Sequence, residues 1–396
     1  MRVLQTVFGV FHHFELAREF HRRGHLQGIY STWPWSRLER EGLPRDMVKT
    51  FPWLHVPEYL LGRSRLDLPW LADELGYRNA LAFDRWSTAQ LQSLLRHGQK
   101  PDVLIGISGS SLQAGRLLQG EGGLFLCDRG STHQRFQQEI VAEEFLRWGV
   151  ARPVSDIRDT TREEAIYDVA DAITVPSTAA QRSFVTMGVP AEKVHVVPYG
   201  VRLEQFTASA EPPREEFCVL FAGAVGLRKG VPYLLEAFAA LRHPRKRLRI
   251  AGAIQEDLRP VLGRLPTEGV EFLGPLPQAE LAALMSRSHT LVLPSIEEGL
   301  ALVQAQALAC GCPVICSTNT GGEDLFTDGV EGYIVPIRDP ASITNRLERL
   351  AQDPGLQQTM RTAAVSRVQQ LGGWREYGDR WEGLLSQLLS AQSRSA

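Results

Sequence analysis

The chain of 396 residues contains no apolar run of 18 or more residues, which is the length that a membrane-spanning helix requires. Its first segment, MRVLQTVFGVF, is too short for a secretion signal, and it is followed by His12-His13-Phe14-Glu15, not by the small residues of a cleavage site. We therefore expect this segment to form a first β-strand. Low-complexity tracts and short internal repeats are also missing, so no repeat architecture is expected.

Charge of one sign is not in excess, because 43 Lys and Arg residues stand against 45 Asp and Glu residues, for a formal net charge of −2. No global basic field therefore attracts nucleic acid or an anionic membrane, and we expect no nucleic-acid partner. Cysteine is scarce, since the five residues are odd in number and lie in apolar strand or helix contexts. This pattern predicts reduced thiols and a cytoplasmic protein.

A cysteine-based metal centre is not expected either. Cys310, Cys312 and Cys316 lie close together in the sequence, but no His neighbours them and three thiols do not complete a zinc shell. Small hydrophobic side chains at a helix end and in a buried strand give the same pattern. We therefore predict that these cysteines pack in the core.

Length and composition predict a soluble globular protein with two domains. Hydrophobic residues make up 43% of the chain and charged residues 22%, which are ordinary values, and 396 residues exceed what one hydrophobic core usually organises. Strand patterns alternate with helix patterns in two successive doubly wound α/β units. We place the domains at residues 1–203 and 204–373, with a linker at Ala208–Arg214, and expect the final segment, 374–396, to cross back onto the first domain.

Short apolar runs before turn residues give the expected strands of the first unit, which are Arg2–Gly9, Gln27–Tyr30, Val103–Ile107, Leu124–Cys127, Ala172–Val175 and Val194–Val197. Those of the second unit are Val219–Ala222, Leu248–Ala251, Glu271–Leu273, Thr290–Leu293 and Val314–Cys316. Helices are expected at Phe14–Arg23, Tyr233–Leu241, Glu280–Ser286 and Trp374–Leu389. The last of these has an apolar face that needs a partner. Residues 31–100, which are rich in Trp, Pro and Arg, are expected to be irregular.

The stretch Leu291–Pro336 carries the clearest functional signal. An apolar strand is followed by the acidic turn Glu297-Glu298-Gly299, by an apolar segment from about Leu300, and by a second strand after Pro313. Strand, turn, helix and strand in this order form a βαβ unit, whose turn lies at the edge where such sheets bind ligands. The free N–H groups and the positive end of the helix form a phosphate site. The arrangement suits a nucleotide-linked substrate.

These residues also carry a family resemblance. The chain reads PSIEEGLALVQAQALACGCPVI, and this resembles the signature Pro-Ser-x-x-Glu-Gly-x-x-Leu-x-x-x-Glu-Ala-x-Ala-x-Gly-x-Pro-Val-Ile of glycosyltransferase family 4. The resemblance covers the whole C-terminal half and is thinner in the N-terminal half. It implies the GT-B architecture, an α/β fold in which two Rossmann-like doubly wound domains face each other across a cleft. It also implies a retaining transferase whose donor substrate is a nucleotide-diphosphate sugar.

By this resemblance, Glu298 is a catalytic residue that approaches the donor sugar. Gln306 stands where the family has a second Glu that holds the nucleotide ribose, and its amide offers hydrogen bonds to ribose hydroxyls without charge. Ribose binding is therefore expected to be weaker here. The nucleotide-binding backbone at the start of the helix is expected to comprise Gly299, Leu300, Ala301 and Leu302.

A second motif, FAGAVGLRKG, follows an expected strand. It resembles the family's Gly-Arg-Leu-x-x-x-Lys-Gly, in which the Arg and the Lys neutralise the diphosphate leaving group. Lys229 matches the catalytic Lys and Gly223 belongs to the nucleotide-binding loop, whereas Ala224 occupies the usual Arg position and Arg228 is the candidate replacement. The chain has no Asp-x-Asp pair, so side-chain cations and a helix N-terminus, with no metal or other cofactor, are expected to stabilise the departing charge. A solvated surface pair is the alternative reading.

A third candidate begins at Asp128, directly after an expected strand, and places polar groups at the carboxyl edge of the first sheet. His133 resembles in placement the family's His that contacts the donor sugar, which makes it a candidate catalytic residue, and a structural histidine is the alternative. His12 and His13 follow the first strand, where the family has an acceptor-side loop whose glycines are missing here. Two readings are open, since these residues either bind acceptor hydroxyls or cap the helix near Phe14.

The segment expected to face the acceptor is the least defined. The Trp33-Pro-Trp35 loop, with Phe51 and Trp53 nearby, offers three open readings, which are docking of a lipid-linked acceptor at a membrane, stacking on sugar, and plain packing. The expected partners are a nucleotide sugar and a carbohydrate or lipid-linked acceptor, with peripheral contact at the inner face of the membrane under the first reading. The sequence gives no oligomeric state.

By resemblance, the predicted activity is that of a metal-independent, hexosyltransferase-type glycosyltransferase in which the leaving phosphate helps to deprotonate the acceptor. Closure about Pro198–Arg214 is expected to exclude water. Two alternatives are open. Gln306 and Ala224 favour an inactive GT-B binding or scaffolding subunit. A nucleotide-sugar epimerase on the same fold is disfavoured by the full run from Pro-Ser to Pro-Val-Ile.

Overall fold

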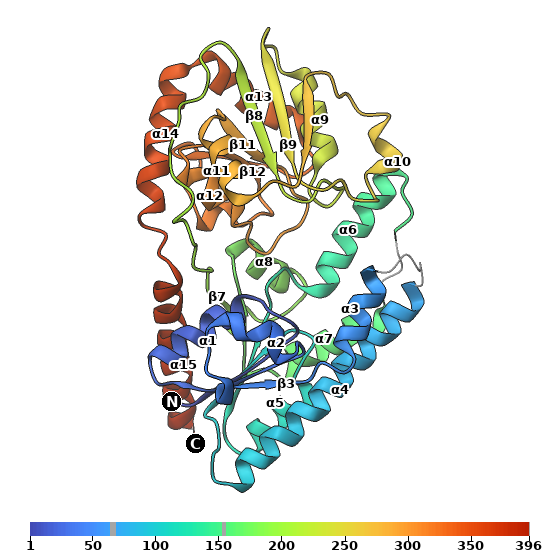
Figure 1. Cartoon of the computed structure of the whole chain (residues 1–396), viewed down its shortest axis with the longest axis vertical. Helices are drawn as coiled ribbons and strands as arrows, with labels where there is room; N and C mark the ends of the chain where they lie inside the picture. The colour runs from blue at the N-terminus through green and yellow to red at the C-terminus, as the bar shows by residue number, and fades with distance from the viewer. Residues whose placement is uncertain (64–68, 153–155, 396) are drawn as a thin grey trace.

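The apolar strands of the chain pair into two parallel sheets, one in each half of the molecule (Figure 1). The computed structural model describes residues 1–63, 69–152 and 156–395. In the first sheet the strands lie in the order β3 (Val48–Thr50), β2 (Leu26–Ser31), β1 (Val3–Val7), β4 (Val103–Ile107), β5 (Leu124–Asp128), β6 (Ala172–Val175) and β7 (Val194–Val196). In the second they lie in the order β10 (Val270–Gly274), β9 (Lys246–Ala251), β8 (Phe217–Ala222), β11 (Thr290–Leu293), β12 (Val314–Ser317) and β13 (Gly332–Val335).

Both sheets have the form that the apolar runs predict. Strand β8, with the sequence FCVLFA, is buried at every position, and it pairs in parallel with β9 and β11. A strand buried on both faces needs helices on both sides of its sheet, which is the doubly wound arrangement. Every expected strand is present, with ends that shift by at most two residues.

Helices cover both sheets. Those of the first half are α1 (His12–Arg22), α2 (Trp35–Leu38), α3 (His55–Arg63), α4 (Pro69–Arg96), α5 (Leu112–Gly120), α6 (Gln134–Trp148), α7 (Ile157–Val169) and α8 (Thr178–Thr186). Those that follow are α9 (Val231–Ala240), α10 (Arg259–Leu262), α11 (Gln278–Ser286), α12 (Val303–Ala309), α13 (Pro340–Gln352), α14 (Pro354–Val368) and α15 (Trp374–Ser395). Short 3₁₀ turns lie at Glu39–Glu41, Arg45–Met47, Ala191–Lys193 and Gly322–Asp324. None of the helices in the described ranges is long and apolar enough to cross a membrane.

The expectation that residues 31–100 are irregular is wrong. This segment contains β3 and the helical hairpin of α3 and α4, and α4 alone is 28 residues long. Its apolar residues do not form one stripe, because α4 packs against α3 and also against α5. Gly76 inside the helix further conceals the helical pattern.

The carboxyl edges of the two sheets meet. Ser177, which follows β6, donates from Oγ to the carbonyl oxygen of Gly299 at 2.5 Å, and it also accepts from the N–H of Ala180 as the N-cap of α8. Thr178 Oγ1 donates to Asp324 Oδ1 across the same junction at 2.7 Å. Residues that follow strands of both sheets therefore lie in direct contact.

The last helix, α15, returns to the first sheet and lies beside α1 (Figure 1). Tyr377, Trp381 and Leu385 of α15 are buried in one apolar cluster with Phe14 and Phe20 of α1. These five side chains provide the partner that the apolar face of the helix needs.

Candidate active site at the junction of the two sheets

Strand β12 fixes the shape of the turn that follows β11. Ser317 Oγ donates to the carbonyl oxygen of Ser295 at 2.5 Å, and Asn319 Nδ2 donates to the carbonyl oxygen of Ile296 at 2.9 Å. Glu298 lies two residues after Ile296 in this turn and is only 8% exposed. The structure thus holds a carboxylate at the carboxyl edge of the second sheet.

Lys229 reaches this carboxylate from the loop after β8. Its Nζ forms an ion pair with Glu298 Oε1, and Ser295 Oγ donates to the same oxygen at 3.2 Å. Gly230 allows the close approach of the two loops, because it has a φ of +67° and a Cβ there would lie 2.0 Å from the carbonyl oxygen of Pro294. The structure therefore brings together the two motifs that the sequence singled out.

Arg228 binds the same turn from the other side. Its Nη1 donates to the carbonyl oxygen of Glu297 at 2.8 Å and to the carboxylate Oε2 of Glu297 at 3.2 Å, and it lies 3.7 Å from Glu298 Oε2. The side chains of Lys229 and Arg228 are 16% and 37% exposed. They are partners of an acidic turn, so the reading as a solvated surface pair is wrong.

Glu297 is the residue of this turn that the sequence analysis left without a role. It is fully buried, and the first domain surrounds its carboxylate with donors at 2.7 to 2.9 Å, which are Ser131 Oγ, Thr132 Oγ1 and Gln137 Nε2. Burial alone would raise the pKa of the Glu297 carboxyl, but Arg228 and these hydrogen bonds outweigh it and hold the pKa below its usual value. Glu297 is therefore an ionised bridge between the two domains.

Arg129 holds two of the first-domain residues that donate to Glu297. It is buried and donates to Glu163 at 3.0 Å, to Gln137 at 2.8 Å and to the carbonyl oxygen of Thr132 at 2.9 Å. Gln137 in turn donates to Glu297. The donors to Glu297 are thus held in place by a buried guanidinium, which limits their freedom to turn away.

The predicted helix start at Leu300 is wrong. Helix α12 begins at Val303, with Leu302 as its N-cap, and the N–H of Ala301 already donates to the carbonyl oxygen of Thr320 at 3.2 Å. Gly299 lies too close to the first domain for a side chain, since a Cβ there would be 2.2 Å from the carbonyl oxygen of Gly130. The segment from Gly299 to Ala301 therefore packs against the other domain and lies outside the helix.

The backbone of this segment still offers hydrogen-bond donors. Within the described residues, the N–H groups of Leu300 and Leu302 have no partner. Gln306, the fourth residue of α12, is half-buried, and its side chain likewise has no hydrogen bond within the ranges that the structure describes. These groups lie C-terminal to Glu298 and remain able to bind a ligand.

The end of β8 offers open space beside Lys229. Gly223 and Ala224 are both exposed, and Gly223 has a φ of +150° with no atom nearer than 3.8 Å to the position of a Cβ. A ligand can therefore approach the backbone closely at this point. Because Ala224 has no charge, Arg228 and Lys229 are the cations of this loop.

His133 occupies a structural position. It is the N-cap of α6, where its Nδ1 accepts the N–H of Arg135 at 3.2 Å, and its ring lies between those of Tyr167 and Phe184 with both centroid distances at 5.0 Å. Burial, together with Arg129 and Arg135, lowers the pKa of His133 to about 4. Its contact with a donor sugar stays a prediction.

His12 and His13 do not cap helix α1. The N-cap is Phe11, and no side chain caps the helix. Instead, His12 Nε2 lies 2.6 Å from Asp128 Oδ2, and His13 Nε2 lies 3.4 Å from the same oxygen. The capping reading is therefore wrong, and the two side chains face the end of β5.

The aromatic loop divides into buried and exposed residues. Trp33 is 7% exposed and packs against the rings of His55 and Tyr59, with centroid distances of 4.5 and 5.0 Å, so packing is the correct reading for this residue. Trp53 is 74% exposed. All five cysteines are buried and free, which agrees with core packing of Cys310, Cys312 and Cys316.

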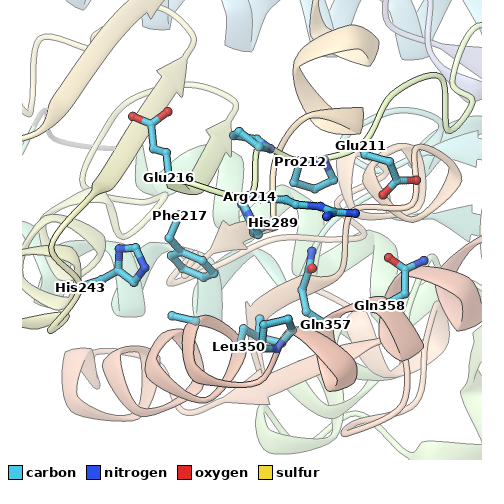
Figure 2. A pocket seen from close by; sticks show the side chains of 13 residues that line it. Glu211, Pro212, Arg214, Glu216, Phe217, His243, His289, Leu350, Gln357 and Gln358 are labelled. Carbon is cyan, nitrogen blue, oxygen red and sulfur yellow. The ribbon is translucent and has the colours of Figure 1, made fainter.

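Among the cavities in the described part of the chain, two bear on where the substrates bind, and both lie away from the Lys229–Glu298 pair. One, of about 630 Å³, is lined by Phe217, His243 and His289 at the amino ends of β8 and β11 (Figure 2). Because the amino ends lie at the opposite edge of the sheet from Glu298, we do not assign the donor to it. The other, of about 310 Å³, lies at the carboxyl edge of the first sheet, and its lining includes Phe8 and Ser108.

Comparison with known protein families identifies both halves of the chain. Residues 204–367 match the family described as "Glycosyl transferases group 1", and residues 13–200 match the "Glycosyl transferase 4-like domain". The two matches leave only residues 201–203 between them. The chain belongs to glycosyltransferase family 4.

Curated relatives of this family 4 member include D-inositol 3-phosphate glycosyltransferases. It is 32% identical over 243 residues to the protein named "D-inositol 3-phosphate glycosyltransferase 1" of Catenulispora acidiphila, a match that covers 55% of this chain and 57% of that protein. The corresponding protein of Kribbella flavida is 30% identical over 233 residues, which cover 53% of this chain and 55% of that protein. The chain thus spans about half the length of the curated relatives it matches.

Solved structures show the fold of this family 4 member. Sucrose-phosphate synthase from Thermosynechococcus elongatus has a TM-score of 0.68 at 21% identity, and the match covers 99% of this chain and 100% of that chain. Anabaena HepE in complex with UDP has a TM-score of 0.67 at 17% identity, with coverage of 98% and 100%. At these identities the likeness concerns the fold alone, and it confirms the predicted GT-B architecture.

Proposed function

We propose that this family member transfers a sugar from a nucleotide-diphosphate donor to a hydroxyl acceptor, with retention of anomeric configuration and without a metal. The observation that carries the proposal is the Lys229–Glu298 ion pair, which joins the two family motifs at the carboxyl edge of the second sheet. A departing nucleoside diphosphate develops negative charge, and Lys229 and Arg228 are cations placed where this charge would form.

Donor binding would rearrange the ion pair. A diphosphate that takes Lys229 as its partner releases Glu298, whose carboxylate is then able to accept hydrogen bonds from the donor sugar. The unpaired N–H groups of Leu300 and Leu302 are donors suited to phosphate oxygens, and the Gln306 amide suits ribose hydroxyls. Each part of the donor thus has a partner of matching chemistry within one segment.

We assign the acceptor to the 310 Å³ cavity of the first domain. Its walls come from the ends of β1 and β4, from the α3–α4 hairpin and from α7. Arg129 connects it to the donor side, because Arg129 bonds Glu163 in the cavity lining and also Gln137, which bonds Glu297. An acceptor held there would lie on the first-domain side of the junction.

The charge of this cavity favours a neutral or cationic acceptor. Its lining includes the carboxyl groups of Glu58, Asp159 and Glu163. Glu163 is paired with Arg129 at 3.0 Å, and Arg162 of the lining is paired with Asp84 at 2.7 Å. Glu58 and Asp159 therefore give the cavity its acidic character. Burial and the nearby carboxylates, Asp156 first among them, raise the pKa of Asp159 to about 6, as expected where negative charges crowd. Carboxyl groups bind hydroxyls well and repel phosphate, so we propose a polyol or glycan acceptor without a phosphate group.

A thermal-shift screen tests the donor half of the proposal. The purified protein is heated with UDP, GDP and ADP and with their glucose, N-acetylglucosamine and mannose derivatives, since a ligand that binds the folded state raises the melting temperature. A shift with one nucleotide and its sugar is expected. The absence of any shift, together with the absence of affinity in calorimetric titration, would remove the donor site from this junction.

The product tests the reaction itself. The selected donor is incubated with phosphate-free polyols and glycosides and with inositol phosphate as the phosphorylated comparison. Proton NMR of the product should show the anomeric configuration of the donor, and inversion would contradict the retaining assignment. Preferential transfer to inositol phosphate would contradict the assignment of the acidic cavity.

Contact with a membrane is a separate proposal about the first domain. Trp53, Leu60 and Trp70 lie on or beside the α3–α4 hairpin and are 74%, 60% and 67% exposed. Exposed aromatic and aliphatic side chains that gather on one hairpin are typical of peripheral membrane contact. Co-sedimentation with phosphatidylglycerol vesicles should be lost in Trp53→Ser with Trp70→Ser, and wild-type protein that stays in solution would contradict the proposal.

A further inference from the structure

The cavity of about 630 Å³ in the second domain has no part in the proposed function. Its walls come from segments that are far apart in the sequence, which are the linker at 211–214, the start of β8, the end of α13 and the start of α14 (Figure 2). The cavity lies at the amino ends of the strands, whereas Glu298 follows the carboxyl end of β11. A molecule bound here would therefore not meet the donor turn.

Two imidazoles of the lining carry N–H donors. His289 Nδ1 accepts the N–H of Cys218 at 3.0 Å, and burial lowers the pKa of His289 to about 4, so its ring is neutral at pH 7. His243 Nδ1 accepts the N–H of Arg245 at 3.2 Å. A ring that accepts at one nitrogen carries its proton on the other, so Nε2–H is the donor of each ring. Neither Nε2 has a hydrogen-bond partner among the described residues.

Gln357 and Arg214 add further donors to the same cavity. Gln357 of α14 is 8% exposed, and its Nε2 has no hydrogen-bond partner in the part of the chain that the structure describes. Buried amide N–H groups without a partner are rare, and a ligand or an ordered water commonly satisfies them. The exposed Arg214 likewise has no hydrogen bond or ion pair within the described ranges. Figure 2 shows Gln357 extending from α14 toward the linker, where Arg214 lies.

The two carboxylates of the lining already have partners. Glu216 accepts from Arg247 Nε at 2.5 Å, and Glu211 Oε2 lies 3.2 Å from Arg361 Nε. The guanidinium of Arg214 is therefore the unpaired charge of the lining. One positive charge with several neutral N–H donors suits a group that carries a single negative charge. A phosphate monoester, with a charge of about −1.5 to −2, would bring excess negative charge close to the two carboxylates.

The rest of the lining is largely apolar. Phe217 is 3% exposed, and its ring centroid lies 4.9 Å from that of His289 and 5.8 Å from that of His243. Pro212 of the linker and Leu350 of α13 belong to the same lining. Sites for small organic molecules commonly measure about 300–1,000 Å³ and combine apolar or aromatic walls with a few polar groups. This cavity has that size and that composition.

We propose that this cavity is a second ligand site, which takes an organic carboxylate with a flat apolar body. Arg214 would pair with the carboxylate, with Gln357 and the imidazole N–H groups as further donors, and the apolar body would lie against Phe217. The inference does not depend on the proposed function. Arg361 of α14 already bonds the linker at the carbonyl oxygen of Ala210, and a bound carboxylate would add a second connection between these segments.

Three probes with the same flat body test the class of ligand. The probes are 2-naphthoate, its neutral amide 2-naphthamide, and 2-naphthyl phosphate, and each is titrated into the whole protein at pH 7.5 with naphthalene fluorescence as the readout. We expect 2-naphthoate to bind about tenfold or more tightly than the other two, because only it offers a single negative charge to Arg214. Equal affinity for the amide, tighter binding of the phosphate, or no binding of 2-naphthoate would overturn the proposal.

Two variants test the location of the probe. Arg214→Ala removes the charge and should weaken 2-naphthoate about tenfold while leaving 2-naphthamide unchanged. Ala351→Phe fills part of the cavity from the end of α13 and should weaken both probes. The matched control is Arg242→Ala, because Arg242 is exposed and precedes His243 but is not part of the lining. It should bind 2-naphthoate as wild type does.

The outcomes that contradict the site are specific. Unchanged 2-naphthoate affinity in Arg214→Ala, or an equal loss in Arg242→Ala, would overturn it. Melting temperatures equal to that of wild type exclude a folding defect, and Arg214 is exposed, so its variant decides the question even where Ala351→Phe does not fold. Saturating UDP, GDP or ADP should not displace 2-naphthoate, and competitive displacement would place the probe in the donor site and overturn the inference.

Discussion

Lys229 is the single residue whose loss should separate chemistry from stability. Under the proposed function, Lys229→Ala removes a charge that would stabilise the departing diphosphate, and such a loss commonly costs ~10²-fold in turnover. Arg228 remains 3.7 Å from Glu298, so the carboxylate keeps a cationic neighbour and the melting temperature should change little. Steady-state kinetics at saturating donor, with Lys100→Ala as control, measures the effect. Turnover of Lys229→Ala within a few-fold of wild type would contradict the assignment.

Gln306 gives a test of the nucleotide site that does not depend on turnover. A carboxylate at this position would make charge-assisted hydrogen bonds to the ribose hydroxyls, which are roughly twice as strong as neutral ones. Gln306→Glu should therefore tighten nucleoside diphosphate binding several-fold, or by about 1 kcal/mol, and Gln306→Ala should weaken it. Calorimetric titration measures both. Weaker binding by Gln306→Glu would mean that another ligand contacts this amide.

Two buried histidines, His13 and His133, and the half-buried His289 predict a loss of stability in mild acid. Burial is the main cause that lowers the pKa of His13 to about 3 and those of His133 and His289 to about 4. Two of them also accept a backbone N–H through Nδ1, His133 from Arg135 and His289 from Cys218, which a protonated nitrogen would forbid. Below the usual histidine pKa of 6.5, these histidines are protonated in the unfolded chain but remain neutral in the folded chain. The free energy of unfolding therefore decreases as the pH is lowered.

The slope approaches about 1.4 kcal/mol per pH unit for each such histidine between the unfolded and folded pKa values. Urea unfolding at pH 7.5, 6.5, 5.5 and 4.5 measures it. Replacing His13 by Gln removes one titrating group and should flatten the slope by one proton. A free energy of unfolding that is constant over this range would show that the buried rings accept protons in the folded state.

Residues whose partners follow strands of the same sheet were predictable, and those with partners in the other domain were not. Lys229 and Glu298 both follow strands of one sheet, so their meeting could be expected from strand order. Glu297 was visible only as an acidic neighbour of Glu298. Its donors Ser131 and Thr132 lie more than 160 residues away, and no local pattern records such a contact.

At the scale of elements, strands were predictable from local sequence, whereas helices that pack against distant elements were not. Buried strands of a parallel sheet are short apolar runs, and each strand expected from such a run has ends within two residues of the prediction. Strands β3 and β13, which have three and four residues, were not predicted. The hairpin of α3 and α4 was missed because α4 packs on two sides, which removes the single apolar stripe. The start of α12 was misplaced because Gly299 packs against Gly130 of the other domain.

The contact between the donor turn and the loop after β5 should govern closure of the two domains. Glu297→Gln keeps the shape of the side chain but removes the charge that Ser131, Thr132, Gln137 and Arg228 surround, and hydrogen bonds to charged groups contribute ~1.5–3 kcal/mol each. We expect a larger radius of gyration by small-angle scattering and a lower kcat, with each domain still folded.

Glu323→Gln is the matched control for closure. Its partner Arg182 also reaches across the junction, at 2.5 Å, but the two side chains are 37% and 50% exposed. Exposed ion pairs contribute little, typically 0–1 kcal/mol. The radius of gyration should therefore not change in Glu323→Gln. An equal change in both variants would show that closure depends on cross-junction charge in general and not on the buried bridge.

At the scale of the whole molecule, the family signature predicted the architecture because it spans the strand, turn and helix that place the donor edge. In both halves of the chain, strand patterns alternate with helix patterns, so two doubly wound units could be predicted from the sequence. The way in which the units meet could not. It depends on side chains such as Ser177 and Glu297 that contact the opposite sheet, and on the seating of α15 over α1.

At the junction of the two domains, two cations stand against the two carboxylates of the donor turn, which leaves little negative charge to bind a metal ion. Arg228 and Lys229 neutralise Glu297 and Glu298, and the carboxylate of Glu297 is already occupied by donors from both domains. Glu298 is the one carboxylate of the turn that a donor would free, and a single carboxylate is a poor divalent-cation site without an Asp-x-Asp partner. Transfer by this family 4 member should therefore persist at full rate in excess EDTA.

The contrary result would also locate the ion. If EDTA abolishes transfer and Mn²⁺ restores it in wild type, the metal-independent assignment fails. Restoration that persists in His12→Gln would then place the ion near Glu298 and the diphosphate, since the imidazole is not needed to hold it. Restoration that disappears in His12→Gln would place the ion between His12, His13 and Asp128, whose ligand atoms already lie within 4.8 Å. Full activity in EDTA would leave the departing charge to Lys229 and Arg228, as the proposed function requires.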